Sequence, residues 1–310
     1  MIHVRTLDEI SLPRSWLTIG VFDGVHRGHQ EIIRRLVTGA HAAGAAAVVL
    51  TFWPHPATVL GESRVKCLST DDERADLLSA LGVDALVTYP FDVSTAATSA
   101  KDFVEQLHRR LHFDHLLIGY DFALGKGREG DAARLSELGK TLGYDVEIVP
   151  ALSDESGVIS STSIRKLVAN GDVSAAAALL GHPYSLHGAV VAGDARGREL
   201  GFPTANIDYA PEKILPSNGI YACWLWLNGQ RHSAAVNVGV RPQFHSGATH
   251  PLVEAYILDF DRNIYGQDVR LDFVRRIRDE MRFPFVSDLI AQIHHDVQQI
   301  QQVLGADNRR

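Results

Sequence analysis

The stretch TIGVFDGVHRGHQEII, residues 18–33, decides the fold of the first half of this 310-residue chain. The apolar, partly β-branched residues from Trp16 to Phe22 predict a strand, and apolar residues at helical spacing from Ile32 to Ala40 predict a helix. The turn between them holds three glycines and two histidines. The stretch therefore reads as strand, tight turn and helix.

The turn is suited to bind phosphate. Glycine lets backbone N–H groups approach an anion, and the positive end of the following helix favours negative charge. His26 and His29 would add two side-chain donors. A purely structural turn is equally compatible with this spacing. The turn lacks the Lys-Ser/Thr pair of a Walker P-loop and the G-x-G-x-x-G spacing of a dinucleotide site, so it indicates phosphate without naming a reaction.

Composition and charge limit the classes of partner. Apolar residues make up 45% and charged residues 22%, as in an ordinary globular chain long enough for two domains. The formal net charge of -7 argues against a nucleic-acid or membrane surface, which would require a basic face. Cys67 and Cys223 are expected to be reduced and buried. With no signal peptide or membrane span visible, we expect a cytoplasmic monomer or weak homo-oligomer.

Strand and helix patterns alternate along the first half of the chain. The alternation predicts a doubly wound parallel sheet, whose ligands gather at the carboxyl ends of the strands. Three loops, residues 22–29, 54–56 and 120–130, lie at such ends. The further expected strands are residues 46–52, 85–89, 115–119 and 145–149, and the further helices are residues 70–81, 99–110 and 132–142.

The pattern changes near LGHPYSLHG, residues 180–188, and we place the domain boundary between residues 182 and 183. Strand-like segments then follow, joined by turns with Gly, Pro or Asn, and they predict a small antiparallel barrel. These segments are residues 186–192, 221–227, 233–238, 253–258 and 269–273. A final helix is expected to cover the barrel with one apolar side. That side carries Leu289, Ile293, Val297, Ile300 and Leu304.

Three further loops of the first half carry polar groups. TFWPHP, residues 51–56, has two prolines that rigidify the loop and hold Phe52 and His55 in place. GYDFALGKGREGD, residues 119–131, can form a wall or lid, although such loops are often plain turns. ISSTSIRKL, residues 159–167, places hydroxyls at a helix start, which suits N-capping and phosphate oxygens equally.

The motifs become specific when they are taken together. GVFDGVHRGH, TFWPHP, YDFALGKGREGD and ISSTSIR, in this order, resemble the adenylyltransferase module of bacterial bifunctional riboflavin kinase/FAD synthetases. The second half resembles the riboflavin kinase module of the same family. Its matching segments are GDARGRELGFPTAN (193–206), GIYA (219–222), NVGVRPQF (237–244), VEAYILDF (253–260) and IRDEMRF (277–283). The resemblance covers nearly the whole chain.

The resemblance implies roles for the first module. His26 and His29 would bind ATP phosphates and stabilise the transition state as the phosphate of FMN attacks the α-phosphorus and pyrophosphate leaves. Asp23 would either shape the turn or position the nucleotide. The implied ATP-binding residues are Gly20, Phe22, Asp23, Gly24, Gly28, Ser161, Thr162 and Arg165, and the flavin-binding residues are Phe52, His55, Asp121 and Phe122.

The second module needs other groups. Thr204 and Asn206 stand two apart on an expected strand, so their oxygens face one side and can share a hard cation, although a plain polar strand face is the alternative. The resemblance implies that they hold Mg²⁺ on the ATP phosphates, and that Glu254 accepts the proton of the attacking ribityl hydroxyl. It also implies a nucleotide loop and two flavin contacts. These are Gly193, Arg196, Gly197, Gly201 and Pro203, and Arg278 and Glu280.

The sequence departs from the family pattern at four positions. Ala123 and Leu124 stand where Arg and Phe are common, Gln243 replaces a usual Thr, and Tyr256 replaces a common His. None removes a residue assigned to chemistry. We therefore expect an enzyme that converts riboflavin and ATP to FMN in the barrel and FMN and ATP to FAD in the sheet. The alternatives are a nucleotidyltransferase for another acceptor, such as a phosphopantetheine or nicotinate nucleotide, and a flavin-binding regulator without catalysis.

Overall fold

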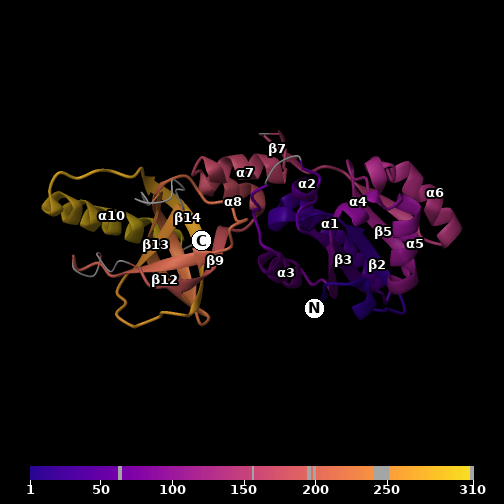
Figure 1. Cartoon of the computed structure of the whole chain (residues 1–310), viewed down its shortest axis with the longest axis horizontal. Coiled ribbons are helices and arrows are strands. Elements are labelled where there is room, and N and C mark those ends of the chain that lie inside the picture. The colour runs from indigo at the N-terminus through magenta and orange to yellow at the C-terminus, as the bar shows by residue number, and fades with distance from the viewer. Residues whose placement is uncertain (62–64, 156, 194–196, 198–199, 241–250, 308–310) are drawn as a thin grey trace. The chain divides into compact units, whose positions relative to one another are not determined.

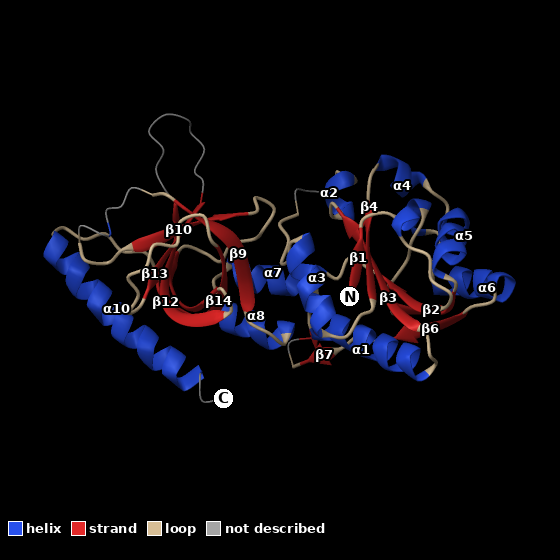
Figure 2. Ribbon diagram, turned by 90° about the horizontal axis from the view of Figure 1, so that it is seen from below, coloured by secondary structure: helices blue, strands red, loops and turns tan. Residues whose placement is uncertain are grey.

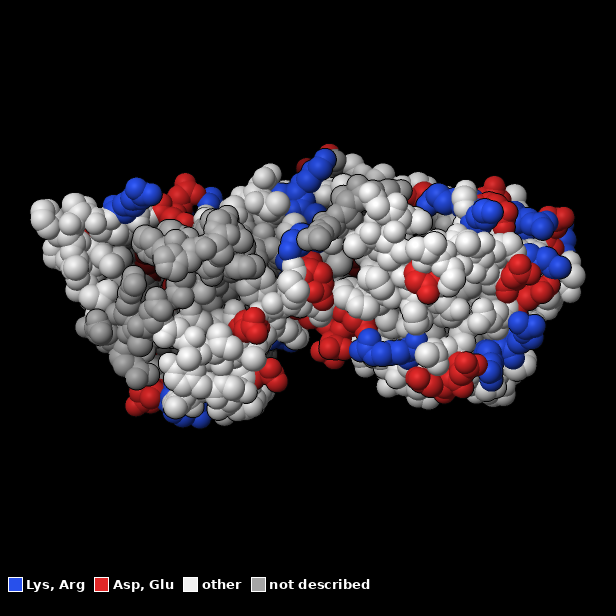
Figure 3. Space-filling view, viewed as in Figure 1, with Lys and Arg blue, Asp and Glu red and all other residues white. Residues whose placement is uncertain are grey.

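The computed structural model describes residues 1–61, 65–155, 157–193, 197, 200–240 and 251–307 (Figure 1). The chain forms two compact units, Met1–Ser161 and Thr162–Arg310, here called the sheet unit and the barrel unit. On the face shown in Figure 3, Lys and Arg side chains are interspersed with Asp and Glu side chains over both units. None of the described helices is both long enough and apolar enough to cross a membrane.

The sheet unit contains the predicted parallel sheet, which has six strands in the order β1-β4-β3-β2-β5-β6 and so one more, β1, than the sequence predicted. Two buried apolar clusters lie on opposite faces of this sheet, one under α1 and α3 and the other under α5 and α6, so the sheet is doubly wound (Figure 2). The strands are β1 (Ile2–Val4), β2 (Ser15–Ile19), β3 (Ala46–Trp53), β4 (Ala85–Pro90), β5 (Phe113–Gly119) and β6 (Asp145–Val149).

The helices of the sheet unit begin at polar caps. Thr70 and Glu73 form a capping box at the start of α3, and Asp131 caps α6. A two-stranded ladder, β7 (Ser153–Asp154) and β8 (Gly157–Val158), precedes the barrel unit. The helices are α1 (Arg27–Ala42), α2 (Pro56–Val59), α3 (Asp71–Ala80), α4 (Val93–Ala97), α5 (Ala100–Leu111) and α6 (Ala132–Leu142), with short 3-10 turns η1 (Leu7–Glu9), η2 (Asp23–Val25) and η3 (Lys126–Arg128).

The first predicted strand is shorter than expected. The prediction runs to Phe22, but β2 ends at Ile19. The reason is the backbone of the following turn, because Phe22 and Gly24 take left-handed φ angles of 50° and 76°, which no strand contains. The apolar character of Val21 and Phe22 therefore serves the packing of the turn, and Phe22 is buried.

The barrel unit contains the predicted closed antiparallel barrel, in the order β10-β13-β12-β11-β14-β9, with β9 paired to β10. Two short helices, α7 (Ser161–Ala169) and α8 (Val173–Leu180), precede it, and Ser174 Oγ of α8 donates to Val274 O at 2.9 Å. Our boundary after residue 182 stays a prediction. The strands are β9 (Tyr184–Val191), β10 (Thr204–Tyr209), β11 (Gly219–Leu227), β12 (Gln230–Val240), β13 (Pro251–Ile257) and β14 (Asp268–Arg278).

The last helix, α10 (Val286–Asp307), divides its apolar side between two tasks. Ile300 and Leu304 are buried against Ala222 of the barrel, so this half covers the barrel as predicted. Leu289, Ile293 and Val297 instead line a cavity, described below. Cys67 and Cys223 are free and buried, as expected.

Candidate active sites

The turn of residues 20–29, here called the phosphate turn, follows β2 and ends in the first residues of α1. His26 caps α1, because its Nδ1 accepts from the backbone N–H of His29 at 3.4 Å. The rings of His26 and His29 stack with centroids 3.6 Å apart, and Phe22 packs edge-on against His29 at 5.2 Å. The two predicted histidines therefore lie together at the positive end of a 16-residue helix.

The electrostatic environment keeps His29 neutral. Burial lowers the pKa of His29 well below its ordinary value, and the charges of His26 and Arg74 lower this pKa further. Nδ1 of His29 is buried and has no hydrogen-bond partner in the described part of the chain. In the tautomer that carries its proton on Nδ1, this nitrogen is a donor that needs an acceptor, which a phosphate oxygen can supply.

Asp23 shapes the phosphate turn. Its carboxylate accepts from the backbone N–H groups of Leu68 and Ser69 at 2.9 and 3.0 Å, and Ser69 Oγ accepts from Gly24 N–H at 2.9 Å. The side chain is thus directed at the backbone of residues 68–69. A role of Asp23 in binding the nucleotide stays a prediction.

The ISSTSIR segment meets the phosphate turn. Ser161 Oγ donates to the carbonyl of Asp23 at 2.9 Å, and a Cβ on Gly28 would lie 3.9 Å from the carbonyl of Ile159. Two segments more than 130 residues apart are thus in contact, as their shared assignment to ATP requires. Thr162 and Arg165 follow in α7, where Arg165 Nη1 donates to Thr162 Oγ1 at 3.5 Å.

A cavity of about 680 Å³, here called the sheet cavity, opens beside the strand ends. Its lining contains all four residues predicted to bind flavin in this module, and Gly20 and Val21 of the phosphate turn. The four are Phe52, His55, Asp121 and Phe122. Phe91 and Phe103 add aromatic walls, and Arg128 adds a cation. Such a lining suits a planar aromatic ligand with polar edges. Ala123 and Leu124, two of the departures, also line it.

Three polar residues form a row across neighbouring strands of the barrel. Asn206 of β10 lies directly opposite Glu254 of β13, which in turn lies opposite Asn237 of β12. Thr204 pairs in the same way with Tyr256. Because directly opposite residues share a sheet face, Thr204, Asn206 and Glu254 all point to one side. The expectation that the two oxygens of β10 face one side is confirmed.

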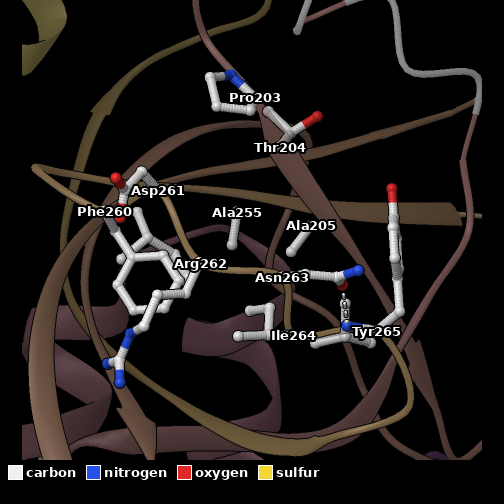
Figure 4. A pocket seen from close by; sticks show the side chains of 12 residues that line it. Pro203, Thr204, Ala205, Ala255, Phe260, Asp261, Arg262, Asn263, Ile264 and Tyr265 are labelled. Atoms are coloured by element: carbon white, nitrogen blue, oxygen red, sulfur yellow. Dashed lines mark hydrogen bonds between the residues drawn. The ribbon is translucent and has the colours of Figure 1, made fainter.

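Thr204 lies between two cavities. The first, about 280 Å³ and here called the barrel cavity, lies between barrel strands and α10 and is lined by Glu254, Asn237, Arg278 and Glu280. The second, about 310 Å³ and here called the loop cavity, is lined by Pro203 and by the loop of residues 260–265 (Figure 4). Thr204 lines both cavities. One residue therefore borders both cavities.

The loop of residues 260–265, which lines the loop cavity, was not predicted from the sequence to form a site. Phe260, Asp261 and Arg262 lie on one side of it, and Tyr265 lies on the other, with its N–H bonded to Asn263 Oδ1 at 3.0 Å (Figure 4). An aromatic pair with a cation and a carboxylate suits a nucleobase and its ribose. The signal was the polar and aromatic stretch directly after VEAYILDF.

The predicted nucleotide loop approaches the same strand. A Cβ on Gly193 would overlap the side-chain amide of Asn206, and one on Gly197 would lie 3.4 Å from Thr204 Oγ1. Gly201 takes a left-handed φ of 85°. Both loop glycines thus lie against the two residues predicted to hold a cation. Arg196 and Gln243 lie outside the described residues.

Arg278 is held by the last helix. Its Nε donates to both carboxylate oxygens of Asp296 at 3.0 Å, and its Nη2 donates to Oδ2 at 2.6 Å. Asp296 is buried and lines the barrel cavity with Arg278. Glu280 accepts from Asn218 Nδ2 at 3.1 Å. Asp296 was not predicted from the sequence, although a charge within the apolar side of a helix was a usable signal.

Known proteins match the two units separately and together. A family model described as FAD synthetase matches residues 9–163, and one described as riboflavin kinase matches residues 180–304. The bifunctional riboflavin kinase/FMN adenylyltransferase of Listeria monocytogenes is 36% identical, over 96% of this chain and 94% of that protein. The protein of the same name from Haemophilus influenzae is 38% identical, over 91% of this chain and 92% of that protein.

A solved structure matches the whole chain as well. The crystal structure of a protein named a macrolide-efflux protein, from Streptococcus pneumoniae, has a TM-score of 0.88 and 30% sequence identity. The match covers 97% of this chain and 98% of that one, so the two chains share both folds. With both family models and full-length relatives in agreement, this chain belongs to the family of bifunctional riboflavin kinase/FMN adenylyltransferases.

Proposed function

We propose that the chain makes FAD from riboflavin in two ATP-dependent steps, one in each unit. The barrel unit transfers the γ-phosphoryl group of ATP to riboflavin and releases FMN and ADP. The sheet unit transfers the adenylyl group of a second ATP to FMN and releases FAD and pyrophosphate. The observation that carries this proposal is the position of Thr204 between two cavities, with the carboxylate of Glu254 in one of them.

The kinase step uses the row across the barrel. We assign riboflavin to the barrel cavity, where Arg278 and Glu280 contact the flavin, and the adenosine of ATP to the loop cavity. The γ-phosphoryl group then meets the ribityl hydroxyl near Thr204. Glu254 takes the proton of that hydroxyl as its oxygen attacks the γ-phosphorus. Besides this proton transfer, the step needs alignment of the two substrates and neutralisation of charge on the phosphates.

The residues beside Glu254 fit a magnesium ion. Thr204 and Asn206 present a hydroxyl and a carboxamide on one strand face, Asn206 is buried, and oxygen donors are the ligands that Mg²⁺ prefers. We assign the ion to these two residues. When bound, Mg²⁺ neutralises charge on the ATP phosphates. Gly193 and Gly197 let the nucleotide loop approach these residues closely, because a Cβ on Gly193 would overlap the side-chain amide of Asn206 and one on Gly197 would overlap the carbonyl of Phe202.

The adenylyl step uses the phosphate turn. We assign the flavin of FMN to the sheet cavity and the ATP phosphates to the backbone N–H groups and histidines at the start of α1. An oxygen of the FMN phosphate attacks the α-phosphorus, and the pyrophosphate leaves with the electron pair of the broken bond. Neutral His29 donates to a phosphate oxygen on which negative charge develops. Ser161, Thr162 and Arg165 complete the phosphate contacts in this proposal.

The remaining proposals concern context. We place the functional boundary after residue 182 and both reactions in the cytoplasm, supported by two buried free cysteines. A monomer or weak homo-oligomer without nucleic-acid partners is supported by a net charge of -7. Sedimentation of the purified chain, with and without added DNA, tests both statements.

One assay tests the function. The purified chain is incubated with riboflavin, ATP and Mg²⁺, and the products are separated by chromatography. We expect FMN and ADP, followed by FAD and pyrophosphate. Unchanged riboflavin would refute the kinase assignment, and unchanged FMN, supplied directly, would refute the adenylyltransferase assignment. Adenylylation of a phosphopantetheine or nicotinate nucleotide, with FMN left unchanged, would assign the sheet unit to another acceptor.

A further inference from the structure

Arg74 of α3 is a buried cation beside the phosphate turn. Only 1% of its surface is exposed, although arginine is almost never fully buried unless it is paired. Within the described part of the chain, Arg74 forms no ion pair, and its Nε is buried without a hydrogen-bond partner. Such burial is costly for stability, so a functional reason for this side chain must be sought.

The guanidinium joins the phosphate turn to the end of β3. Nη1 of Arg74 donates to the carbonyl of Val21 at 3.0 Å and to Thr51 Oγ1 at 2.8 Å, and it lies 3.5 Å from the carbonyl of Phe52. Thr51 Oγ1 donates in turn to the carbonyl of Val21 at 2.9 Å. Val21 belongs to the phosphate turn, and both Val21 and Phe52 line the sheet cavity. Arg74 therefore supports the place where the phosphate turn and the sheet cavity meet.

The carboxylates around Arg74 are engaged elsewhere. Asp23 accepts from the backbone of Leu68 and Ser69, Glu73 accepts from Thr70 N–H in the capping box, and Asp71 pairs with Arg5 and Thr88. Asp71, Asp23 and Glu73 still favour the charged form of Arg74, and burial opposes it. The positive charge of Arg74 is thus not neutralised by direct contact. In a poorly screened interior it acts over several ångströms.

That charge reaches the catalytic histidine pair. Arg74 is one of two charged groups that lower the pKa of His29, and His26 is the other. Arg74 approaches from α3, and His26 lies on the turn itself. A triphosphate in the phosphate turn would meet the same fixed charge, with the sign that attracts it.

We propose that Arg74 is a positioning residue of the adenylyltransferase site, which fixes the phosphate turn against the end of β3 and supplies a permanent positive charge behind the triphosphate. Arg74 itself touches no substrate in this proposal. The inference rests on the adenylyltransferase activity proposed for the sheet unit.

The test compares Arg74→Met and Arg74→Lys with the wild-type chain. Arg134→Met is the matched control, because Arg134 is an exposed arginine of the same unit that pairs with Glu137 on the surface. Each protein is assayed for FAD formation from supplied FMN and for FMN formation from riboflavin. We expect Arg74→Met to raise the KM for ATP in FAD formation by about tenfold, the size of a lost charged hydrogen bond. Arg74→Lys should keep part of the affinity, and FMN formation should stay within about twofold.

A second measurement distinguishes a positioning role of Arg74 from a purely structural role. The pKa of His29 is measured by NMR titration, with the resonance assigned through His29→Gln. Removal of the Arg74 charge should raise the pKa of His29 in Arg74→Met, and Arg74→Lys should leave this pKa low. An unchanged titration and an unchanged KM for ATP in Arg74→Met would overturn the inference.

Two further outcomes are decisive. If Arg74→Met does not fold, the test relies on Arg74→Lys and Thr51→Val. Thr51→Val removes one hydrogen-bond acceptor of Arg74 and keeps the charge. It should therefore raise the KM for ATP and leave the pKa of His29 low. Equal losses of FAD and FMN formation in Arg74→Lys would overturn the inference, since the effect would not be specific to the sheet unit. A wild-type chain that makes no FAD from FMN would refute the proposed function, and the inference with it.

Discussion

Asn206 and Glu254 lie directly opposite each other on β10 and β13. Cross-strand partners of this kind have Cβ atoms about 5 Å apart. A candidate cation ligand and a candidate general base are thus brought together by the register of one strand pair, and a one-residue slip of that register would place them on opposite faces.

Replacement of Glu254 tests the general base. Glu254→Gln keeps the shape of the side chain but cannot accept the proton, so FMN formation should fall by about 10²- to 10⁴-fold. FAD formation from supplied FMN should continue at the wild-type rate. Both rates are measured by chromatography of the flavins. Glu212→Gln, at a half-buried position of the same unit, serves as the control. Loss of both activities in Glu254→Gln would contradict separate sites.

His29→Gln should have the opposite effect. Loss of the donor at the phosphate turn removes stabilisation of the developing charge, and FAD formation should fall by about 10²- to 10³-fold. Phosphorylation of riboflavin should be unaffected. The matched variant is His41→Gln, which changes an exposed histidine near the other end of α1. A normal rate of FAD formation in His29→Gln would remove this residue from the mechanism.

The low pKa of His29 makes the sheet unit sensitive to acid. In the unfolded chain His29 titrates near 6.5, and in the folded chain it titrates below that value. As the pH falls through 6.5, the unfolded state therefore binds more protons than the folded state. The free energy of unfolding consequently falls as the pH falls in that window. Thermal unfolding between pH 5 and 8 should show this loss, and His29→Gln should show a smaller one. Equal slopes in the two proteins would contradict the assignment.

Asp296→Asn should weaken riboflavin binding through Arg278. The change removes the charge that holds the guanidinium at the barrel cavity, and breaking a buried ion pair costs about 3 kcal/mol of unfolding free energy. We expect a higher KM for riboflavin with little change in the KM for ATP, because Arg278 lines the barrel cavity and not the loop cavity. Asp288→Asn, at an exposed position of α10, is the control. A rise confined to the KM for ATP would argue against this pairing.

Gly193→Ala should disturb the candidate magnesium site. The new Cβ would overlap the side-chain amide of Asn206 and displace it. The Mg²⁺ concentration for half-maximal FMN formation should rise several-fold, as titration with MgCl₂ would show. Gly305→Ala adds the same methyl group where, among the described residues, no atom outside its own helix turn lies within 4 Å, and it should behave as wild type. An unaltered magnesium requirement in Gly193→Ala would speak against Asn206 as a ligand.

The elements of both units follow from local patterns in the sequence. The predicted strand over residues 145–149 and the predicted helix over 132–142 have the bounds of β6 and α6, because apolar spacing and the Asp131 cap are local signals. The end of β2 at Ile19 was not predictable, since left-handed φ angles decided it and the apolar pattern did not. The spacing of glycines and histidines in residues 20–29 was also equally compatible with a purely structural turn and with a phosphate site.

The residues that sequence reasoning missed depend on contacts distant in the chain. Arg74 reads as an ordinary charged residue of a helix, and only its bonds to Val21 and Thr51 reveal its burial. Asp296 gains its role from Arg278, 18 positions earlier. The loop of residues 260–265 becomes a cavity wall only when the barrel closes beside Thr204. The resemblance to a known family identified the motif residues. The residues that hold them in place are identified only by the tertiary packing.

The place of Thr204 on both cavity walls has a thermodynamic consequence for the two substrates. If occupancy of one cavity rotates or polarises this hydroxyl, the affinity of the other cavity changes, and energetic coupling between sites is reciprocal. Nucleotide and vitamin then alter each other's dissociation constants by one common factor. Any change in this coupling on replacement of Thr204 would therefore be equal in both directions.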